Sequence, residues 1–93
     1  MNKDVLICVP SYNEEECITK TLEGLRESFP EIPVIVVDDG SHDKTFQMAR
    51  STGVEVIRHP VNLGQSGAIR TGFKYALLEG FDIVVTFDAD LQH

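Results

Sequence analysis

Asp88 and Asp90 are the pair of side chains with the clearest chemistry, since they follow an apolar run and are separated by one residue. In an extended backbone, side chains two positions apart point to the same side, so both carboxylates can meet one ligand. Two carboxylates held close together repel each other unless one is protonated or a cation joins them. Mg²⁺ and Mn²⁺ prefer hard oxygen ligands, and Mg²⁺ commonly combines one or two carboxylates with substrate phosphates. We therefore expect a divalent metal site here, although an isolated Asp-x-Asp sequence is more often a solvated turn.

Three earlier polar clusters also follow apolar runs, and they span residues 10–14, 38–41 and 62–67. Tyr12 offers an aromatic face for a base, or is an ordinary half-buried ring. Adjacent aspartates cannot point the same way, so we expect one of Asp38 and Asp39 to be structural and the other to face a ligand. Gly64 and Gly67 permit close approach of the backbone, which suits either a phosphate near a helix N-terminus or tight packing of a helix on a sheet.

These clusters need a scaffold that brings them together, and the apolar pattern predicts one. Apolar runs predict strands at residues 5–9, 34–37 and 83–87, and the more alternating segment 54–57 predicts a shorter strand at an edge of the sheet. Helical patterns lie between them, at about residues 13–29, 43–51 and 65–78. This βαβαβαβ order predicts an α/β fold with a Rossmann-like parallel sheet. Ligands of open parallel sheets bind outside the carboxyl ends of the strands, so all four clusters are expected on one rim.

Local signals set the expected ends and faces of the helices. Asn13 followed by Glu16 is a capping-box pattern at the start of the first helix. The third helix is expected to turn its apolar face to the sheet, and that face comprises Ile69, Phe73, Ala76 and Leu77. The histidines share no metal-ligand spacing, and we expect His42 and His59 to be solvated.

The totals bound the class of protein. The 93 residues suffice for one small domain, and the 42% apolar and 25% charged fractions are those of soluble globular proteins. A formal net charge of -7 argues against nucleic acid or an anionic membrane surface as the main partner. No apolar run is long enough for a signal peptide or a membrane span, and the two cysteines have no metal or redox spacing. We therefore expect a cytoplasmic protein.

Four segments together resemble one family, the family-2 inverting glycosyltransferases of GT-A fold. The order and spacing of that family's motifs are matched by VPSYNEEE, VVDDGSHDKT, NLGQSGAIRTGFKYAL and VVTFDADLQH. The resemblance covers essentially the whole chain, and it is greatest to the branch of dolichol-phosphate mannose synthases and polyprenyl-phosphate glycosyltransferases. It implies transfer of a hexose from a GDP- or UDP-sugar to an acceptor, most simply a polyprenyl or dolichyl phosphate, with inversion at the anomeric carbon. Such an acceptor would place the full-length enzyme at the cytosolic face of a membrane.

The resemblance also implies which residues bind the nucleotide sugar. The nucleoside pocket is expected to be lined by Pro10, Tyr12 and Glu14, with the backbone of Val37 and a hydrogen bond from the base to Asp39. The diphosphate is expected to bind through Mg²⁺ or Mn²⁺, held by Asp88, Asp90 and Gln92, while Ala89 touches the nucleotide by its backbone. Asp90 is the expected catalytic residue, because it holds the metal that stabilises the departing diphosphate.

Family members continue well past the Asp-x-Asp motif into acceptor-binding elements. Residues 1–93 are therefore expected to form a single nucleotide-sugar-binding domain without the acceptor half, which binds its donor but transfers no sugar alone. The family's strand order, 3-2-1-4, would leave the fourth strand at an edge, and residues 82–87 there are mostly apolar. An unprotected apolar edge invites pairing with another chain. We therefore expect a homodimer joined near the fourth strands.

Three other classes share parts of the pattern. A receiver-type signalling domain has a similar βα repeat, but its acidic pair would follow the first strand instead of the second. A dinucleotide-binding Rossmann module would carry G-x-G-x-x-G after the first strand, and no such sequence follows residues 5–9. A non-catalytic nucleotide-sugar-binding module stays open, and an assay of sugar transfer against binding alone separates it from an enzyme.

Overall fold

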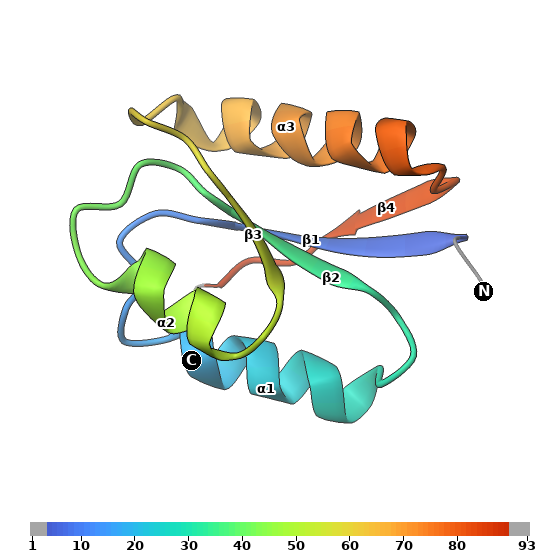
Figure 1. The fold of residues 1–93 in the computed structure, drawn as a ribbon, viewed down its shortest axis with the longest axis horizontal. Helices are drawn as coiled ribbons and strands as arrows, with labels where there is room; N and C mark the ends of the chain where they lie inside the picture. The colour runs from blue at the N-terminus through green and yellow to red at the C-terminus, as the bar shows by residue number, and fades with distance from the viewer. Residues whose placement is uncertain (1–3, 90–93) are drawn as a thin grey trace.

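A four-stranded parallel sheet with helices on both faces is the framework of the molecule in the computed structural model, which describes residues 4–89 (Figure 1). Its elements alternate along the chain: β1 (Val5–Ser11), α1 (Ile18–Ser28), β2 (Val34–Asp38), α2 (Thr45–Ser51), β3 (Glu55–Arg58), α3 (Gly64–Glu79) and β4 (Ile83–Thr86). The strand order is β3-β2-β1-β4, and every neighbouring pair is parallel. Both the α/β class and the expected order 3-2-1-4 are confirmed.

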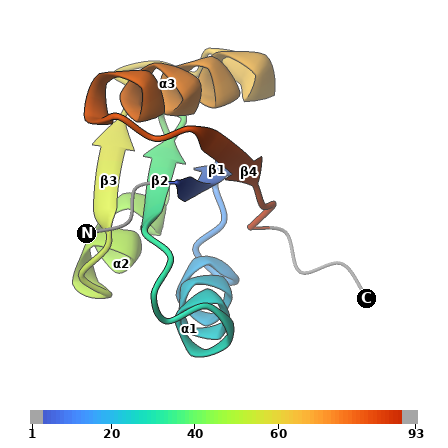
Figure 2. The same ribbon diagram turned by 90° about the vertical axis from the view of Figure 1, so that its right-hand side faces the viewer.

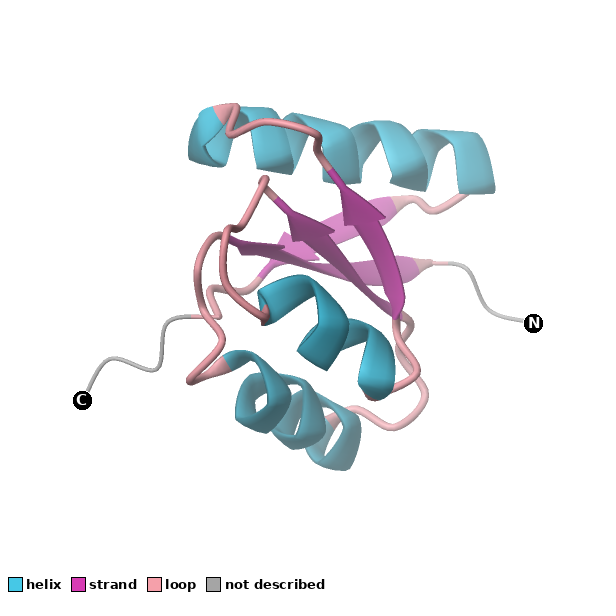
Figure 3. Cartoon of the chain, turned by 60° about the vertical axis from the view of Figure 1, so that its left-hand side comes forward, coloured by secondary structure: helices cyan, strands magenta, loops and turns pink. Residues whose placement is uncertain are grey.

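Helices cover the sheet in two layers, with α3 on one face and α1 and α2 on the other (Figures 2 and 3). Successive residues of β1 alternate between these layers. Ile7 and Val9 pack with the α1 residues, whereas Leu6 and Cys8 pack with Ala68 and Ala76 of α3. Because both faces of the central strands β1 and β2 are covered, each of these two strands contains an unbroken apolar run, which is the pattern seen in the sequence.

The N-terminus of α1 differs from the capping-box prediction. Helix α1 begins at Ile18, and its N-cap residue Cys17 makes no side-chain cap hydrogen bond. Asn13, at a positive φ of 53°, instead joins the turn after β1 to the turn after β2. Its backbone N–H donates to Ser41 Oγ at 2.8 Å, and its Oδ1 accepts from the His42 N–H at 2.9 Å. The side chain that local spacing assigned to a cap therefore ties two loops of the site together.

The face that α3 turns to the sheet consists of small residues and not of the predicted large ones. Ala68, Gly72 and Ala76 are the buried positions of α3, one turn apart. Phe73 and Leu77 are 51% and 79% exposed, so their predicted place in the core is wrong. Small residues allow the helix axis to approach β1 closely, and a Cβ on Gly72 would collide with the Cys8 side chain.

Strand β4 is the outer strand of the described sheet and pairs with β1 alone among residues 4–89. Val84 packs toward α3, whereas Ile83, Val85 and Phe87 alternate with it and are exposed. No helix within residues 4–89 is long and apolar enough to cross a membrane.

Candidate nucleotide site

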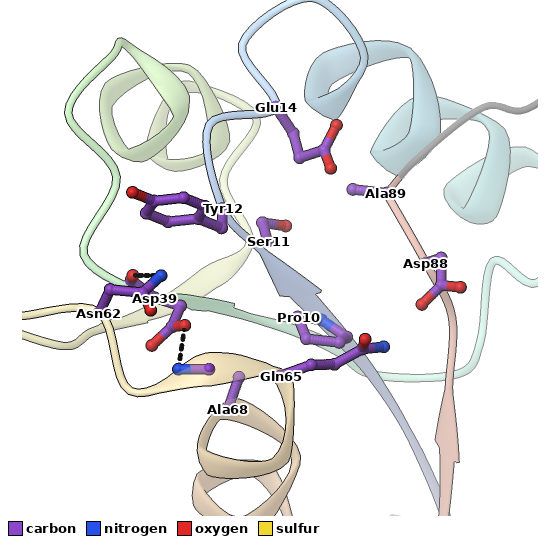
Figure 4. Close-up of a pocket in the computed structure, with 11 residues that line it drawn as sticks. Pro10, Ser11, Tyr12, Glu14, Asp39, Asn62, Gln65, Ala68, Asp88 and Ala89 are labelled. Atoms are coloured by element: carbon purple, nitrogen blue, oxygen red, sulfur yellow. Dashed lines mark hydrogen bonds between the residues drawn. The ribbon is translucent and has the colours of Figure 1, made fainter.

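A pocket of about 320 Å³ opens at the carboxyl ends of the strands (Figure 4). All four polar clusters contribute to its wall, which consists of Pro10, Ser11, Tyr12, Glu14, Asp39, Asn62, Gly64, Gln65, Ala68, Asp88 and Ala89. The parallel sheet explains this convergence, because β1, β2, β3 and β4 all end on the same side. Residues almost 80 positions apart in the chain thus face one cavity, and its size suits a small organic ligand.

Most of the residues expected to bind a nucleotide lie in this wall, namely Pro10, Tyr12, Glu14, Asp39, Asp88 and Ala89. Val37 is fully buried in the core beneath α3, so its side chain does not reach the pocket. Asp90 and Gln92 lie outside the described residues. Sequence reasoning assigned no role to Ser11, Asn62, Gln65 or Ala68, although the first three stand in the polar clusters that it singled out.

The carboxylate of Asp39 is the best-anchored polar group of the pocket. Its Oδ1 accepts hydrogen bonds from the Leu63 N–H and from His59 Nδ1, both at 2.8 Å, and its Oδ2 accepts from the Gly64 N–H at 2.8 Å. Leu63 is the N-cap residue of α3, and its side chain has no oxygen that could accept a hydrogen bond from the first N–H groups of the helix. Asp39, at the end of β2, accepts these hydrogen bonds instead. Burial raises the pKa of Asp39, but these three hydrogen bonds outweigh it and hold the pKa below its usual range.

This cap also bears on the two glycines of the third cluster. The Gly64 N–H is already donated to Asp39, and Gly64 adopts a φ of +88° that favours glycine. A Cβ on Gly67 would lie 2.8 Å from Leu63 Cβ, so this glycine makes room for the N-cap residue of its own helix. The Gly67 contact is with the start of its own helix and not with the sheet, and nothing lies within 4 Å of a Cβ on Gly64, so tight packing on the sheet does not explain these glycines and the phosphate alternative stays a prediction.

His59 was expected to be solvated, and this prediction is wrong, because the residue is only 7% exposed. Its ring lies between the end of β2 and helix α3, where Nδ1 meets Asp39 Oδ1 and Nε2 meets Thr71 Oγ1, both at 2.8 Å. Strand β3 ends at Arg58, and the side chain of the next residue, His59, lies against α3 instead of pointing to solvent. His42 is exposed, as expected.

Asp38 is fully buried and does not line the pocket. Its Oδ1 accepts from the Ser41 N–H at 3.3 Å, and its Oδ2 lies 3.4 Å from Arg58 Nε. The Arg58 guanidinium stacks on the Phe46 ring, 4.4 Å from the ring centroid. This arrangement gives Asp38 a structural place in the loop after β2, while its neighbour Asp39 faces the pocket.

The segment after β4 places Asp88 at the pocket by burying the next residue. Ala89 is buried against the α1 side of the core, and its carbonyl accepts a hydrogen bond from Thr21 Oγ1 at 3.1 Å. Asp88, on the other side of the backbone, is exposed and lines the pocket. No group of three or more potential metal ligands lies within residues 4–89. Asp88 is nevertheless an accessible carboxylate beside space for a ligand, which suits a Mg²⁺ or Mn²⁺ ion that takes further ligands from substrate phosphates.

Comparison with known proteins places this geometry in a family. Residues 6–93 match the family described as glycosyl transferase family 2. The chain belongs to glycosyltransferase family 2. The family-2 chain is 50% identical to an uncharacterized protein of Methanocaldococcus jannaschii, over all of this chain and 38% of that protein. It is 39% identical to an undecaprenyl-phosphate mannosyltransferase of Micrococcus luteus, over 96% of this chain and 39% of that protein.

Solved structures with the same fold include GT-A glycosyltransferases in complex with their ligands. A mannosyltransferase from Pyrobaculum calidifontis in complex with GDP-Man and Mn²⁺ superposes with a TM-score of 0.80, at 25% identity, over 97% of this chain and 28% of that one. The glucosyl-3-phosphoglycerate synthase of Mycobacterium tuberculosis with Mn²⁺ and UDP gives 0.75, at 26% identity, over 98% of this chain and 35% of that one. The GT-A fold and the resemblance to polyprenyl-phosphate glycosyltransferases are thereby confirmed. The family-2 chain spans less than half the length of these relatives.

Proposed function

We propose that this chain is the nucleotide-sugar-binding part of a glycosyltransferase that transfers a hexose from a GDP- or UDP-sugar with inversion. The observation that carries the proposal is the single pocket in which Tyr12, Asp39 and Asp88 meet. An aromatic ring and an ionised carboxylate on one side suit a nucleoside, and a carboxylate on the opposite wall suits a metal-bound diphosphate (Figure 4). Structural neighbours of the same fold were solved with GDP-Man or UDP together with Mn²⁺, which supports this assignment.

The proposed residue roles follow the walls of the pocket. Pro10, Tyr12 and Glu14 line the nucleoside side, and Asp39 accepts a hydrogen bond from the base. Asp88, together with Asp90 and Gln92 beyond the described residues, holds Mg²⁺ or Mn²⁺, which stabilises negative charge on the departing diphosphate when bound. The backbone of Ala89 borders the nucleotide, and the backbone of Val37 contributes to the nucleoside side. Asp90 is the proposed catalytic residue, because it would help to hold the metal that stabilises the departing diphosphate.

A polyprenyl or dolichyl phosphate is the acceptor we propose for the complete protein. The undecaprenyl-phosphate mannosyltransferase of Micrococcus luteus and the polyprenol monophosphomannose synthase of Mycolicibacterium smegmatis, 39% and 31% identical to this chain, support it by their names. A phosphate monoester is already an anionic nucleophile, so the reaction needs no protein base to activate it. This acceptor places the reaction at the cytosolic face of a membrane.

Titration with GDP-mannose and UDP-glucose, with and without Mn²⁺, tests the donor site directly. Saturable, metal-dependent binding of either sugar nucleotide supports the proposal, and binding of neither contradicts it. A parallel assay of transfer to a polyprenyl phosphate by the complete protein then separates an active transferase from a non-catalytic nucleotide-sugar-binding module, since the 93-residue chain alone is expected to transfer no sugar.

The adjacent aspartates provide a matched pair of variants for the nucleoside pocket. Asp39→Asn is expected to weaken nucleotide binding roughly tenfold, because it removes an acceptor from the pocket, where a hydrogen bond to a charged group is worth about 1.5–3 kcal/mol. Asp38→Asn, at a position away from the pocket, should leave the dissociation constant within about threefold of wild type. Calorimetry measures both constants, and circular dichroism corrects each for the folded fraction. The opposite ranking would mean that Asp38 and not Asp39 serves the ligand.

Self-association along β4 is a second proposal for this chain. Within residues 4–89 β4 pairs on one edge only, and its other edge suits pairing with β4 of a second copy, as do the exposed side chains of Ile83, Val85 and, just after the strand, Phe87. Val85→Lys is expected to convert the dimer to a monomer that keeps its fold, because this side chain points to solvent in a single copy. Val84→Lys should instead destabilise the fold, since Val84 packs toward α3. Light scattering of the 93-residue chain reads the mass, and a wild-type monomer at high concentration would rule the proposal out.

A further inference from the structure

The imidazole of His59 joins the pocket residue Asp39 to helix α3. Its side chain is 8% exposed, and both ring nitrogens have partners, Asp39 Oδ1 at Nδ1 and Thr71 Oγ1 at Nε2, each at 2.8 Å. His59 is not one of the residues that line the pocket. Its direct contact with a pocket-lining residue is the one to Asp39.

The partners of His59 determine which nitrogen carries the proton. Hydrogen bonds lower the pKa of Asp39, so its carboxylate is ionised at neutral pH and can only accept. Nδ1 must therefore be the donor of this pair. The Thr71 hydroxyl can either donate to Nε2 or accept from it, so the contact accommodates both a neutral and a charged ring. The donor to Asp39 is thus present in either protonation state of His59.

The hydrogen bonds on Asp39 leave it little freedom to turn. A carboxylate has about four acceptor positions, and three are filled by His59, Leu63 and Gly64. Oδ1 takes two of these donors, whereas Oδ2 takes one and keeps an acceptor position. Without the Nδ1–H of His59, Oδ1 would keep only the Leu63 N–H. The carboxylate could then rotate and present a different arrangement of acceptors to the pocket.

We propose that His59 is a positioning residue for nucleotide binding, whose Nδ1–H fixes the Asp39 carboxylate so that one acceptor position stays directed to the base. This proposal rests on the proposed function, because it takes Asp39 as the group that receives a hydrogen bond from the nucleotide. It adds the residue that follows β3 to a site otherwise built from pocket-lining side chains. It also predicts that the position of one nitrogen atom, and not the bulk of the ring, is what the site requires.

Two amide variants separate the two ring nitrogens. The side-chain nitrogen of Asn at position 59 can take the place of Nδ1 and donate to Asp39, whereas that of Gln can take the place of Nε2 and reach Thr71. His59→Asn is expected to bind UDP or GDP, with Mn²⁺, within about threefold of wild type, and His59→Gln to bind roughly tenfold more weakly. A role in filling space alone would favour Gln, which is closer to His in size. Equal binding by both variants, or better binding by His59→Gln, would overturn the proposal.

A double-mutant cycle shows whether the effect passes through Asp39. In an Asp39→Asn background, His59→Gln should cause less than about a twofold further loss of nucleotide affinity, since the group it positions is already changed. A full, additive loss would show that His59 acts by another route and would overturn the proposal. His42→Gln is the matched control, because His42 is exposed on the loop that follows Asp39, and it should bind like wild type.

A measurement on the free protein separates this proposal from the proposed function. The carboxyl carbon of Asp39, followed by NMR, should titrate at a higher pH in His59→Gln than in wild type, because a donor to the ionised form is lost. His59→Asn should titrate like wild type. If wild type binds neither nucleotide, the proposed function fails, but this titration still reports whether His59 holds Asp39. An unchanged titration in His59→Gln would overturn the positioning role by itself.

Discussion

Removal of the divalent metal is expected to weaken the binding of UDP or GDP to this chain by at least about 100-fold, roughly 2.7 kcal/mol. The walls of the pocket carry the carboxylates of Glu14, Asp39 and Asp88, and none of the pocket-lining residues in the described part of the chain is Lys or Arg. The whole chain has a formal net charge of -7. A diphosphate would enter a negative environment, where each like-charge pair about 4 Å apart costs roughly 1 kcal/mol in water and about 4 kcal/mol near a protein surface. A bound Mn²⁺ or Mg²⁺ reverses the sign of this interaction.

Calorimetry in Mn²⁺ and in EDTA measures the effect. Asp90→Ala and Asp88→Asn should each reproduce a large part of the EDTA result, because each removes an expected ligand of the ion. Asp82→Asn provides the control, since it removes the same charge from an exposed position just before β4, at the opposite end of that strand. Equal affinity with and without metal would show that the two aspartates of the motif do not act through a cation.

Gly72→Val is expected to unfold the chain or to lower its stability by more than about 3 kcal/mol, as overpacking of a tight core does. Gly72 lies where α3 crosses β1, and a Cβ there would collide with Cys8 Sγ and lie 3.3 Å from Cys8 Cβ. Cys8 is fully buried in the middle of β1, between Thr86 of β4 and Ile35 of β2, so it has little room to move aside. A small domain has about 5–15 kcal/mol of stability in total, so such a loss is large.

Urea unfolding followed by circular dichroism measures this change in free energy. Gly24→Ala is the matched control, because Gly24 lies in α1 with nothing within 4 Å of an added Cβ, and it should raise stability by about 0.4–1 kcal/mol. Gly72→Ala alone should also lose stability. Adding Cys8→Ala to Gly72→Ala should recover part of that loss, since the second change removes the sulfur atom that the new methyl group meets. A Gly72→Val protein as stable as wild type would mean that α3 does not lie this close to the sheet.

The order of elements was predictable because β1, β2 and β4 carry apolar runs that end in polar clusters, and β3 is a shorter alternating segment with a polar cluster a few residues beyond it. The face of α3 was not, because periodicity marks apolar residues but does not show how close a helix must lie to its sheet. The buried positions of α3 are occupied by small residues, namely Ala68, Gly72 and Ala76. The larger Phe73 and Leu77 are exposed. The four strands themselves follow from the pattern, whereas their order followed from the family resemblance.

The sequence predicted which polar clusters form the candidate site, but it did not predict the hydrogen bonds between their residues. The pocket joins all four clusters, but the partners of Asp39 lie 20 to 25 positions away, too far for local spacing to indicate them. One signal was available: α3 starts after Leu63 and has no acidic residue in its first turn, so its cap had to come from elsewhere. The same reasoning would have predicted that His59 is buried, since a buried carboxylate needs hydrogen-bond donors.

The burial of Ala89 restricts how this motif can change over evolution. Its methyl group has no chemical function, yet it is packed against α1 and held through its carbonyl by Thr21 Oγ1. A larger side chain at position 89 would lift the segment off α1 and carry Asp88 with it. Lineages that keep the donor site should therefore tolerate only small residues at position 89 and retain a hydroxyl at position 21. Two positions 68 residues apart would then be inherited as a pair, although neither side chain carries any of the chemistry.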